Sequence, residues 1–338
     1  MTDPVRGLAA GIDISVVIPC RNGSATIGEQ LDALLSQRTG ATFEVIVADN
    51  GSTDDTADAV RAYTDPRVRL VDASRAKGAN AARNDGVAAA RGPVILMTDA
   101  DDIVHEGWVE AYWTAFGSGI HAAGGGLDRV LAQRGQVLAR ERRLYRAHVG
   151  DVSFANGTNC GFSRAAFDAV GGFDESFQGG ADEVDFFWRI AEAGYTLELV
   201  AGAVVTKVQH TDLGDAFAQH FEYGRGEARL ARKFRPHLLG PITATAMANA
   251  VLWGVIRSTV ARVTPASRRK ATCTFAWHLG MCVEGARLLE AQRTPRLAVE
   301  PTVRSRPPAA GRAGARPAAC RQALVRRLGR RDLPEPQP

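Results

Sequence analysis

The chain has 338 residues, of which 45% are hydrophobic and 23% charged, and its formal net charge is +4. This length allows one large core plus a smaller appendage, and the composition is that of a soluble globular protein. The five cysteines are widely spaced and form no Cys-x-x-Cys pair, which argues against both a disulfide framework and a cysteine zinc site. No long apolar segment precedes Ile14, so we expect a cytoplasmic protein.

The first hundred residues alternate between expected strands and helices. Strands are predicted at residues 14–19, 43–48, 68–71 and 94–98, and helices at residues 27–35, 53–62 and 79–90. This alternation is typical of an open α/β sheet, in which ligands bind beyond the carboxyl ends of the strands. The polar loops after Pro19, Ala48 and Thr98 should therefore open at one edge.

The middle of the chain is less regular. Residues 122–152 have only weak alternation and many arginines, which suggests a strand and a mobile loop. A Gly-rich segment at 157–172 surrounds one short helix at 164–170, and a helix at 184–193 precedes a strand at 196–205.

Beyond Ala216 the pattern is helical, with helices expected at residues 216–234, 242–263 and 271–289. The apolar stretch 242–256 falls short of the roughly 20 residues that span a bilayer. We therefore interpret residues 236–292 as a helical hairpin, which either lies at an anionic membrane surface through Arg268, Arg269 and Lys270 or caps the sheet.

Residues 293–338 are rich in Pro, Arg and Ala and poor in large apolar residues, which predicts a basic disordered tail. Basic tails can serve anionic surfaces, but this one lacks interleaved aromatic residues. We expect no nucleic-acid partner.

Asp99 and Asp101 follow the apolar run 94–98, and residues two apart in a strand face the same side. Two carboxylates with open positions beside them suit Mg²⁺ or Mn²⁺, and Asp102 adds negative potential. An alternative is the N-cap and acidic first turn of a helix. A phosphatase nucleophile loop of the haloacid dehalogenase type is a further rival, whereas Val104 replaces the glycine that a calcium-binding EF-hand loop needs.

Several short motifs occur in a specific order along residues 13–235. They are Val16–Asn22, Val47–Asp54, Lys77–Gly78 with Ala82–Gly86, Thr98–Asp102, Gly171–Asp174, Asp182–Asp185 and His210. In this order and spacing they resemble a bacterial, non-processive family 2 glycosyltransferase of the GT-A fold.

The resemblance implies an α/β fold in which an open sheet has a nucleotide-sugar-binding half and an acceptor half, followed by C-terminal helices. It also implies metal-dependent transfer, with inversion, of a sugar from a nucleoside diphosphate sugar to a hydroxyl of a glycan or lipid-linked acceptor. This activity is typical of cell-envelope polysaccharide biosynthesis, and it places the protein in the cytoplasm or at the inner face of the plasma membrane.

On the donor side, the family pattern places Pro19, Arg21 and Asn22 near the nucleotide and Asp49 at the base edge. A carboxylate accepts the N–H of uracil, which favours a UDP-sugar. Asn50 replaces the commoner second Asp. Lys77, Arg83 and Asp99 complete the donor residues, and a guanidinium such as that of Arg83 suits phosphate oxygens.

The pattern also implies metal ligands and a base. Asp99, Asp101 and His210 would hold Mn²⁺ or Mg²⁺. The family places its general base in a Glu-Asp pair at the start of a helix, but here the order is reversed as Asp182 and Glu183. The alignment favours Glu183 as the base, with Asp182 a close second.

Further sequence features concern the acceptor side, the number of sugars transferred and the alternative of a protein without catalysis. Trp188 is either an acceptor-side residue or a core residue. No Gln-x-x-Arg-Trp motif follows it, which argues for one sugar per acceptor rather than a processive synthase. The main non-enzymatic alternative is a module that binds nucleotide sugars or glycans without catalysis.

Overall fold

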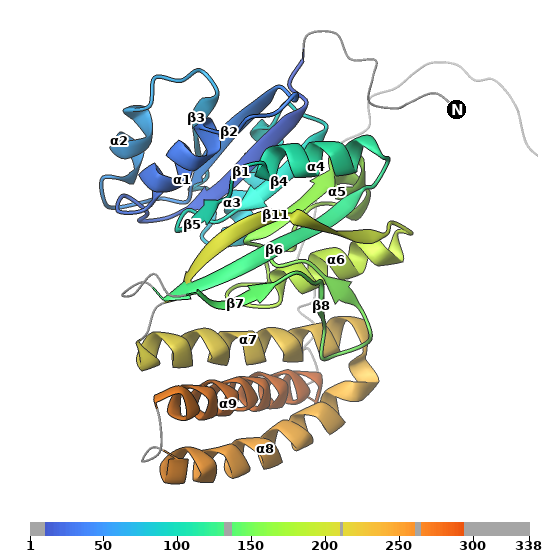
Figure 1. Ribbon diagram of the computed structural model, residues 1–338. Coiled ribbons are helices and arrows are strands. Elements are labelled where there is room, and N and C mark those ends of the chain that lie inside the picture. The colour runs from blue at the N-terminus through green and yellow to red at the C-terminus, as the bar shows by residue number, and fades with distance from the viewer. Residues whose placement is uncertain (1–10, 132–136, 210–211, 261–264, 294–338) are drawn as a thin grey trace, which may run out of the picture. The chain divides into compact units, whose positions relative to one another are not determined.

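A nine-stranded mixed sheet runs through the residues that this computed structural model describes, which are 11–131, 137–209, 212–260 and 265–293 (Figure 1). Its strands are β1 (Ile14–Cys20), β2 (Phe43–Asp49), β3 (Val68–Asp72), β4 (Val94–Thr98), β5 (Asp102–Val104), β6 (Ala122–Leu131), β7 (Val137–Glu141), β10 (Asn159–Ser163) and β11 (Leu197–Gln209). The strand order is β3-β2-β1-β4-β10-β6-β11-β5, with β7 paired to β6. Two short strands, β8 (Tyr145–Arg146) and β9 (Ser153–Phe154), form a separate pair.

The helices in the first hundred residues follow the sequence prediction closely. The helices of the described chain are α1 (Ile27–Leu35), α2 (Thr56–Arg61), α3 (Ala79–Ala89), α4 (Trp108–Gly117), α5 (Arg164–Val170), α6 (Asp182–Glu192), α7 (Leu213–Phe234), α8 (Leu239–Val260) and α9 (Pro265–Arg293), with a 3₁₀ turn at η1 (Pro236–Leu238). The predicted open α/β sheet is confirmed. The helix expected from residue 53 begins only at Thr56, because Asp54 binds the Thr56 N–H and hydroxyl and thereby holds a turn.

Four parallel strands form the first half of the sheet. In their register Cys20 pairs with Asp49, and Asp49 pairs with Asp72. The carboxyl ends of β1, β2 and β3 therefore lie side by side, as the sequence predicts. The loops after these strands, and the turn after β4, open at the same edge.

The second half of the sheet is joined through an antiparallel strand. In the pairing of β10 with β4, Asn159 lies opposite Thr98, so the start of β10 meets the end of β4. Strand β11 runs parallel to β6 and antiparallel to β5, where Lys207 lies opposite Asp102. These pairings bring residues near 158 and 207 to the turn after β4.

Alternate residues of the strands fill two cores, one on each face of the sheet. Val16 and Ile18 on β1 pack with α1 and α4 residues, whereas Val17 packs with Ile95 and the Phe186 region on the opposite face. Both faces are buried, which explains the nearly continuous apolar runs of β1, β2 and β4.

Helix α9 packs against both α7 and α8 (Figure 1). Gly224 on α7 and Gly280 on α9 allow this close approach, because a Cβ atom at either position would lie 1.9 Å from a carbonyl oxygen of the other helix. Trp188 on α6 is buried in the same cluster and stacks on Phe234 with ring centroids 4.3 Å apart, so it is a core residue. The domain boundary at 235/236 stays a prediction.

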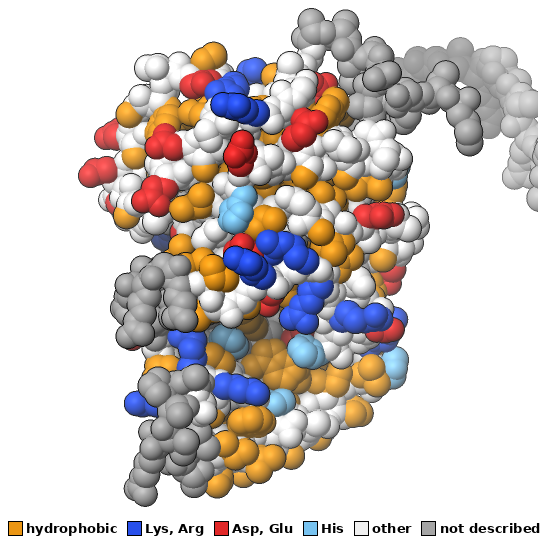
Figure 2. Space-filling model, in the orientation of Figure 1, with side chains coloured by type: hydrophobic (Ala, Val, Ile, Leu, Met, Phe, Trp, Pro, Cys, Tyr) orange, Lys and Arg blue, Asp and Glu red, His pale blue; other side chains and the backbone are white. Residues whose placement is uncertain are grey.

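Helix α8 exposes an apolar face. Met247, Val251, Leu252 and Val255 are 54 to 68% exposed, and Figure 2 shows hydrophobic side chains along this edge of the molecule. The segment Pro236–Ile256 has 21 residues and is long and apolar enough to cross a membrane by length and composition alone. This segment is longer than the apolar stretch 242–256 expected from sequence, because it begins at Pro236 rather than at Ile242.

Some predicted features lie outside the described residues. They are His210, the tail from residue 294 onward and residues 132–136 of the expected mobile loop.

Candidate active site

The loops that follow β1 and β2 are tied together at the carboxyl edge of the sheet. The Thr53 N–H donates a hydrogen bond of 2.8 Å to Asn22 Oδ1. Asn22 has a left-handed φ of 54°, which asparagine tolerates better than most residues. Asp49 ends β2 on the second of these loops, while Pro19 is half-buried in β1 and Arg21 is exposed just after it. Four of the predicted donor residues therefore share one region.

Asn50, which stands where the family pattern has a second Asp, is a buried structural residue. Its Nδ2 donates to the carbonyl oxygens of Ala73 and Ala76 at 2.6 and 2.7 Å, and its Oδ1 accepts from the Gly78 N–H at 2.9 Å. A carboxylate could not make the two donated bonds. The exposed Lys77 lies in the segment that Asn50 fixes.

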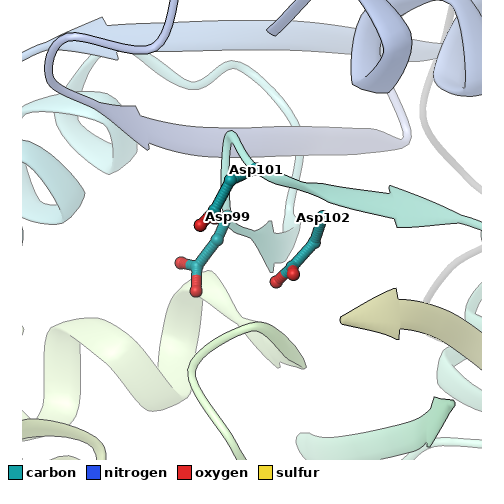
Figure 3. A group of neighbouring side chains, drawn as sticks. All are labelled: Asp99, Asp101 and Asp102. Carbon is teal, nitrogen blue, oxygen red and sulfur yellow. The ribbon is translucent and has the colours of Figure 1, made fainter. Parts of the chain in front are cut away.

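Three carboxylates meet at the turn after β4. One oxygen from each of Asp99, Asp101 and Asp102 lies within 4.8 Å of the others (Figure 3). Gln30 on α1 supports this turn, because its Nε2 donates to Thr98 Oγ1 at 2.8 Å and its Oε1 accepts from the Val104 N–H at 3.1 Å.

The predicted proximity of Asp99 and Asp101 is confirmed, but the reason given from sequence was wrong. Strand β4 ends at Thr98, and both residues lie in the turn that leads to β5. The turn, rather than the pleat of one strand, brings their carboxylates together. Asp102 is the first residue of β5, so the alternative reading as a helix N-terminus is also wrong.

Lys207 and Thr158 complete this cluster, and the sequence did not single out either of them. Lys207 Nζ lies 3.4 Å from Asp99 Oδ2 and 3.3 Å from Asp102 Oδ2, and Thr158 Oγ1 donates to Asp99 Oδ2 at 2.8 Å. Burial tends to raise the pKa of Asp99, but the charges of Lys207 and Arg83 offset this and lower it below its usual value. Burial raises the pKa of Asp102 to about 7.

The predicted acid pair begins helix α6. Burial and the neighbouring charge of Asp182 raise the pKa of Glu183 well above its usual value. Burial also acts to raise the pKa of Asp182, but the Arg83 guanidinium outweighs it, and the pKa is lowered. Of the two carboxyls, Glu183 therefore keeps its proton to higher pH than Asp182.

Arg83 comes from α3 and is 7% exposed. Its Nη1 donates to Asn80 Oδ1 at 2.8 Å and forms an ion pair with Asp182. Its guanidinium also lies over the Phe173 ring, 5.4 Å from the centroid. The side chain expected to approach a diphosphate is thus bound to the acid pair.

Tyr223 on α7 is a further residue near the site that the sequence analysis missed. Burial, followed by the charge of Glu183, raises the pKa of its hydroxyl to about 12, and Lys207 acts in the opposite direction. The acid pair (Asp182 and Glu183) and the acidic turn (Asp99, Asp101 and Asp102) therefore both lie close enough to α7 for their charges to act on Tyr223.

The acidic turn offers a donor set that suits a hard divalent cation. Carboxylate oxygens are the preferred ligands of Mg²⁺ and Mn²⁺, and a divalent charge would offset the crowding of three carboxylates. Asp99 is partly exposed and Asp101 exposed, so both are accessible from solvent. The residues present therefore fit such an ion.

Two family profiles match the chain. Glycosyl transferase family 2 matches residues 15–171, and Glycosyl transferase family group 2 matches residues 94–284. Together they include the acidic turn and the acid pair.

Two curated relatives and one solved structure illustrate the similarity. Succinoglycan biosynthesis protein ExoA of Rhizobium meliloti is 29% identical over 262 residues, which cover 70% of this chain and 78% of ExoA. The Escherichia coli UDP-Glc:alpha-D-GlcNAc-diphosphoundecaprenol beta-1,3-glucosyltransferase WfgD is 37% identical over 90 residues, or 27% of this chain and 35% of WfgD. The mannosyltransferase PcManGT of Pyrobaculum calidifontis, in complex with GDP-Man and Mn²⁺, is 21% identical with a TM-score of 0.56, covering 81% of this chain and 86% of PcManGT.

Coverage differs among the relatives. For some of them the matching segment spans only 26 to 47% of their own length. The likeness to PcManGT shows that the fold is of the GT-A type.

Proposed function

Because this chain belongs to the family 2 glycosyltransferases and is therefore an enzyme, we propose that it transfers one sugar, with inversion, from a nucleoside diphosphate sugar to a hydroxyl acceptor. The observation that carries the proposal is the acidic turn of Asp99, Asp101 and Asp102 at the carboxyl edge of the sheet. The Arg83 guanidinium couples this turn electrostatically to Asp182 and Glu183. Neither a phosphatase nor a non-catalytic module is needed to account for these groups.

Each group has a distinct part in this proposal. Asp99 and Asp101 would hold a divalent cation, which would supply positive charge to neutralise the departing diphosphate. Asp49 accepts an N–H from the nucleotide base, and Asn22 and Arg21 lie beside it. Glu183 takes the proton of the acceptor hydroxyl, because its raised pKa makes its carboxylate a stronger base than that of Asp182.

A UDP-sugar is our preferred donor, since uracil presents one N–H that a carboxylate such as Asp49 accepts. The named donor of WfgD is UDP-Glc, whereas PcManGT was solved with GDP-Man. A screen of UDP- and GDP-sugars, each with Mn²⁺ and with Mg²⁺, should therefore show release of the nucleoside diphosphate. We expect release with at least one UDP-sugar and no release from the Asp101→Asn variant. Equal release by wild type and Asp101→Asn would contradict the metal assignment.

We further propose that a lipid-linked acceptor is reached at a cytoplasmic membrane surface, with α8 in contact with the lipid. Its exposed face carries no charged residue between Leu239 and Ile256, while Arg268 and Lys270 at the start of α9 are exposed. Apolar side chains flanked by cations suit an anionic interface. WfgD, whose name gives a diphosphoundecaprenol-linked acceptor, supports this class of acceptor.

Sedimentation with anionic liposomes tests the membrane contact. The double variant Val251→Asp/Leu252→Asp should sediment less than wild type, because charge on the apolar face opposes insertion. Val137→Asp, at an exposed apolar position on β7, is the matched control and should sediment like wild type. Failure of wild-type protein to bind these liposomes would refute the proposal.

A further inference from the structure

The side chain of Lys207 on β11 reaches the acidic turn because of the strand register. In the antiparallel pairing of β11 with β5 it stands directly opposite Asp102. Its Nζ atom is 3.3 Å from Asp102 Oδ2 and 3.4 Å from Asp99 Oδ2. Residues directly opposite in a ladder are held at short distance, so this ammonium is fixed by the sheet rather than by a flexible loop.

The ammonium is also held by its own hydrogen bonds. An ammonium group has three N–H donors, and Lys207 Nζ has three acceptors around it: Asp99, Asp102 and, at 2.7 Å, Thr158 Oγ1. The Thr158 hydroxyl in turn donates to Asp99. The positive charge thus occupies the side of the acidic turn that faces β11 and β10, and it uses carboxylate oxygens that a divalent cation would otherwise have available.

Charge decides what this arrangement does. The ammonium of Lys207 lies against Asp99 and Asp102 and lowers the net negative charge of the acidic turn by one. On the basis of the proposed function, we propose that Lys207 is a resident counter-ion that competes with a free divalent cation. The cation then binds well only together with the diphosphate of the donor. Lys207 is then a positioning residue that couples metal binding to donor binding.

The physical argument is Coulombic. A divalent cation held by Asp99 would lie near Nζ, and like charges at such separations repel appreciably even at the effective dielectric of a protein surface. A nucleoside diphosphate adds negative charge beside the cation and offsets this repulsion. Binding of the two ligands is therefore cooperative, and by linkage each raises the affinity of the other by the same factor.

Titration of the protein with Mn²⁺ alone, followed by the electron paramagnetic resonance signal of free Mn²⁺, tests this inference. Without nucleotide, Lys207→Met should bind Mn²⁺ at least roughly tenfold more tightly than wild type, because the competing charge is gone. Lys207→Arg keeps the charge and should behave like wild type. With UDP or GDP present, the gain in Mn²⁺ affinity should be large for wild type and small for Lys207→Met.

Lys233→Met is the matched control. Lys233 also pairs with two carboxylates, those of Asp174 and Asp185 at 2.7 and 2.6 Å, but it lies outside the acidic turn. This variant should leave Mn²⁺ affinity unchanged. If Lys207→Met does not fold, Lys207→Gln replaces it, with folding checked by thermal melting.

The outcomes separate this inference from the proposed function. If wild type binds Mn²⁺ with nucleotide but Lys207→Met binds free Mn²⁺ no more tightly than wild type, the competitor role is wrong and the metal site stands. If Asp101→Asn binds Mn²⁺ as well as wild type does, with and without nucleotide, the metal site itself is wrong.

Discussion

Replacing Asp182 by Asn should move the pH dependence of the reaction rather than abolish the reaction. In the structure the negative charge of Asp182 helps to hold the proton on Glu183, whose pKa is raised well above its usual value, with burial as the larger cause. A general base works only when deprotonated, so kcat/KM should fall as the pH drops below the pKa of Glu183. Removing the charge of Asp182 lowers that pKa, and the acidic limb of the profile should move to lower pH.

The size of the shift follows from the like-charge interaction. A neighbouring charge shifts a carboxyl pKa by about one to three units, which corresponds to about 1.4 to 4 kcal/mol. Arg83 acts in the same direction, because it loses its ion pair with Asp182 and its charge then favours the ionised form of Glu183. We therefore expect the limb to move by about one unit or more.

The assay is release of the nucleoside diphosphate with acceptor present, measured across pH for wild type, Asp182→Asn, Glu183→Gln and Glu192→Gln. Glu183→Gln should lower kcat by roughly 10² or more without weakening donor binding. Glu192, exposed near the end of α6, is the control and should leave the profile unchanged. Loss of turnover at every pH in Asp182→Asn, with turnover retained in Glu183→Gln, would instead make Asp182 the base.

Two further substitutions test how the donor edge is built. Asn50→Asp would restore the family's commoner residue but should lower the free energy of unfolding by about 1 to 3 kcal/mol. The reason is that a carboxylate would then face the carbonyl oxygens of Ala73 and Ala76. An unchanged urea midpoint of unfolding would refute this. Gly86→Ala would place a Cβ atom 2.4 Å from Val17 Cγ1 and should lower the free energy of unfolding by about 1 to 3 kcal/mol, whereas Gly117→Ala meets nothing within 4 Å and should not. Thermal melting compares these two glycine variants, and equal melting temperatures would show that the core beside Val17 adapts.

The elements that sequence predicted well have local signals. Strands β1, β2 and β4 are continuous apolar runs because both faces are buried, and their polar loops meet at one edge because parallel strands end there. Asp99 and Asp101 could be found because they directly follow the apolar run of β4. Their true placement in a turn was missed, because β5 has only three residues and so gives almost no periodic signal.

Lys207 and Thr158 could not be predicted from sequence, because pairing between strands far apart in the chain places them at the site. Lys207 reaches the acidic turn only because β11 pairs with β5, and Thr158 only because β10 begins beside the end of β4. Neither register can be read from a local pattern, since both strands are joined to partners far away in the chain. Tyr223 depends in the same way on how α7 packs.

Arg83 interacts with both halves of the site, the acidic turn after β4 and the acid pair at the start of α6. It lies on α3, within the half that precedes the acidic turn, yet it pairs with Asp182 on α6 and also lowers the pKa of Asp99. Within the described residues its buried Nε atom has no hydrogen-bond partner, so the side chain is held by charge and ring contact more than by a full set of hydrogen bonds. Because this guanidinium stabilises the ionised form of Asp182, Asp182 loses its proton at lower pH than Glu183 does. The reversed Asp-Glu order therefore leaves the longer, more basic side chain at the position where the family pattern has its base.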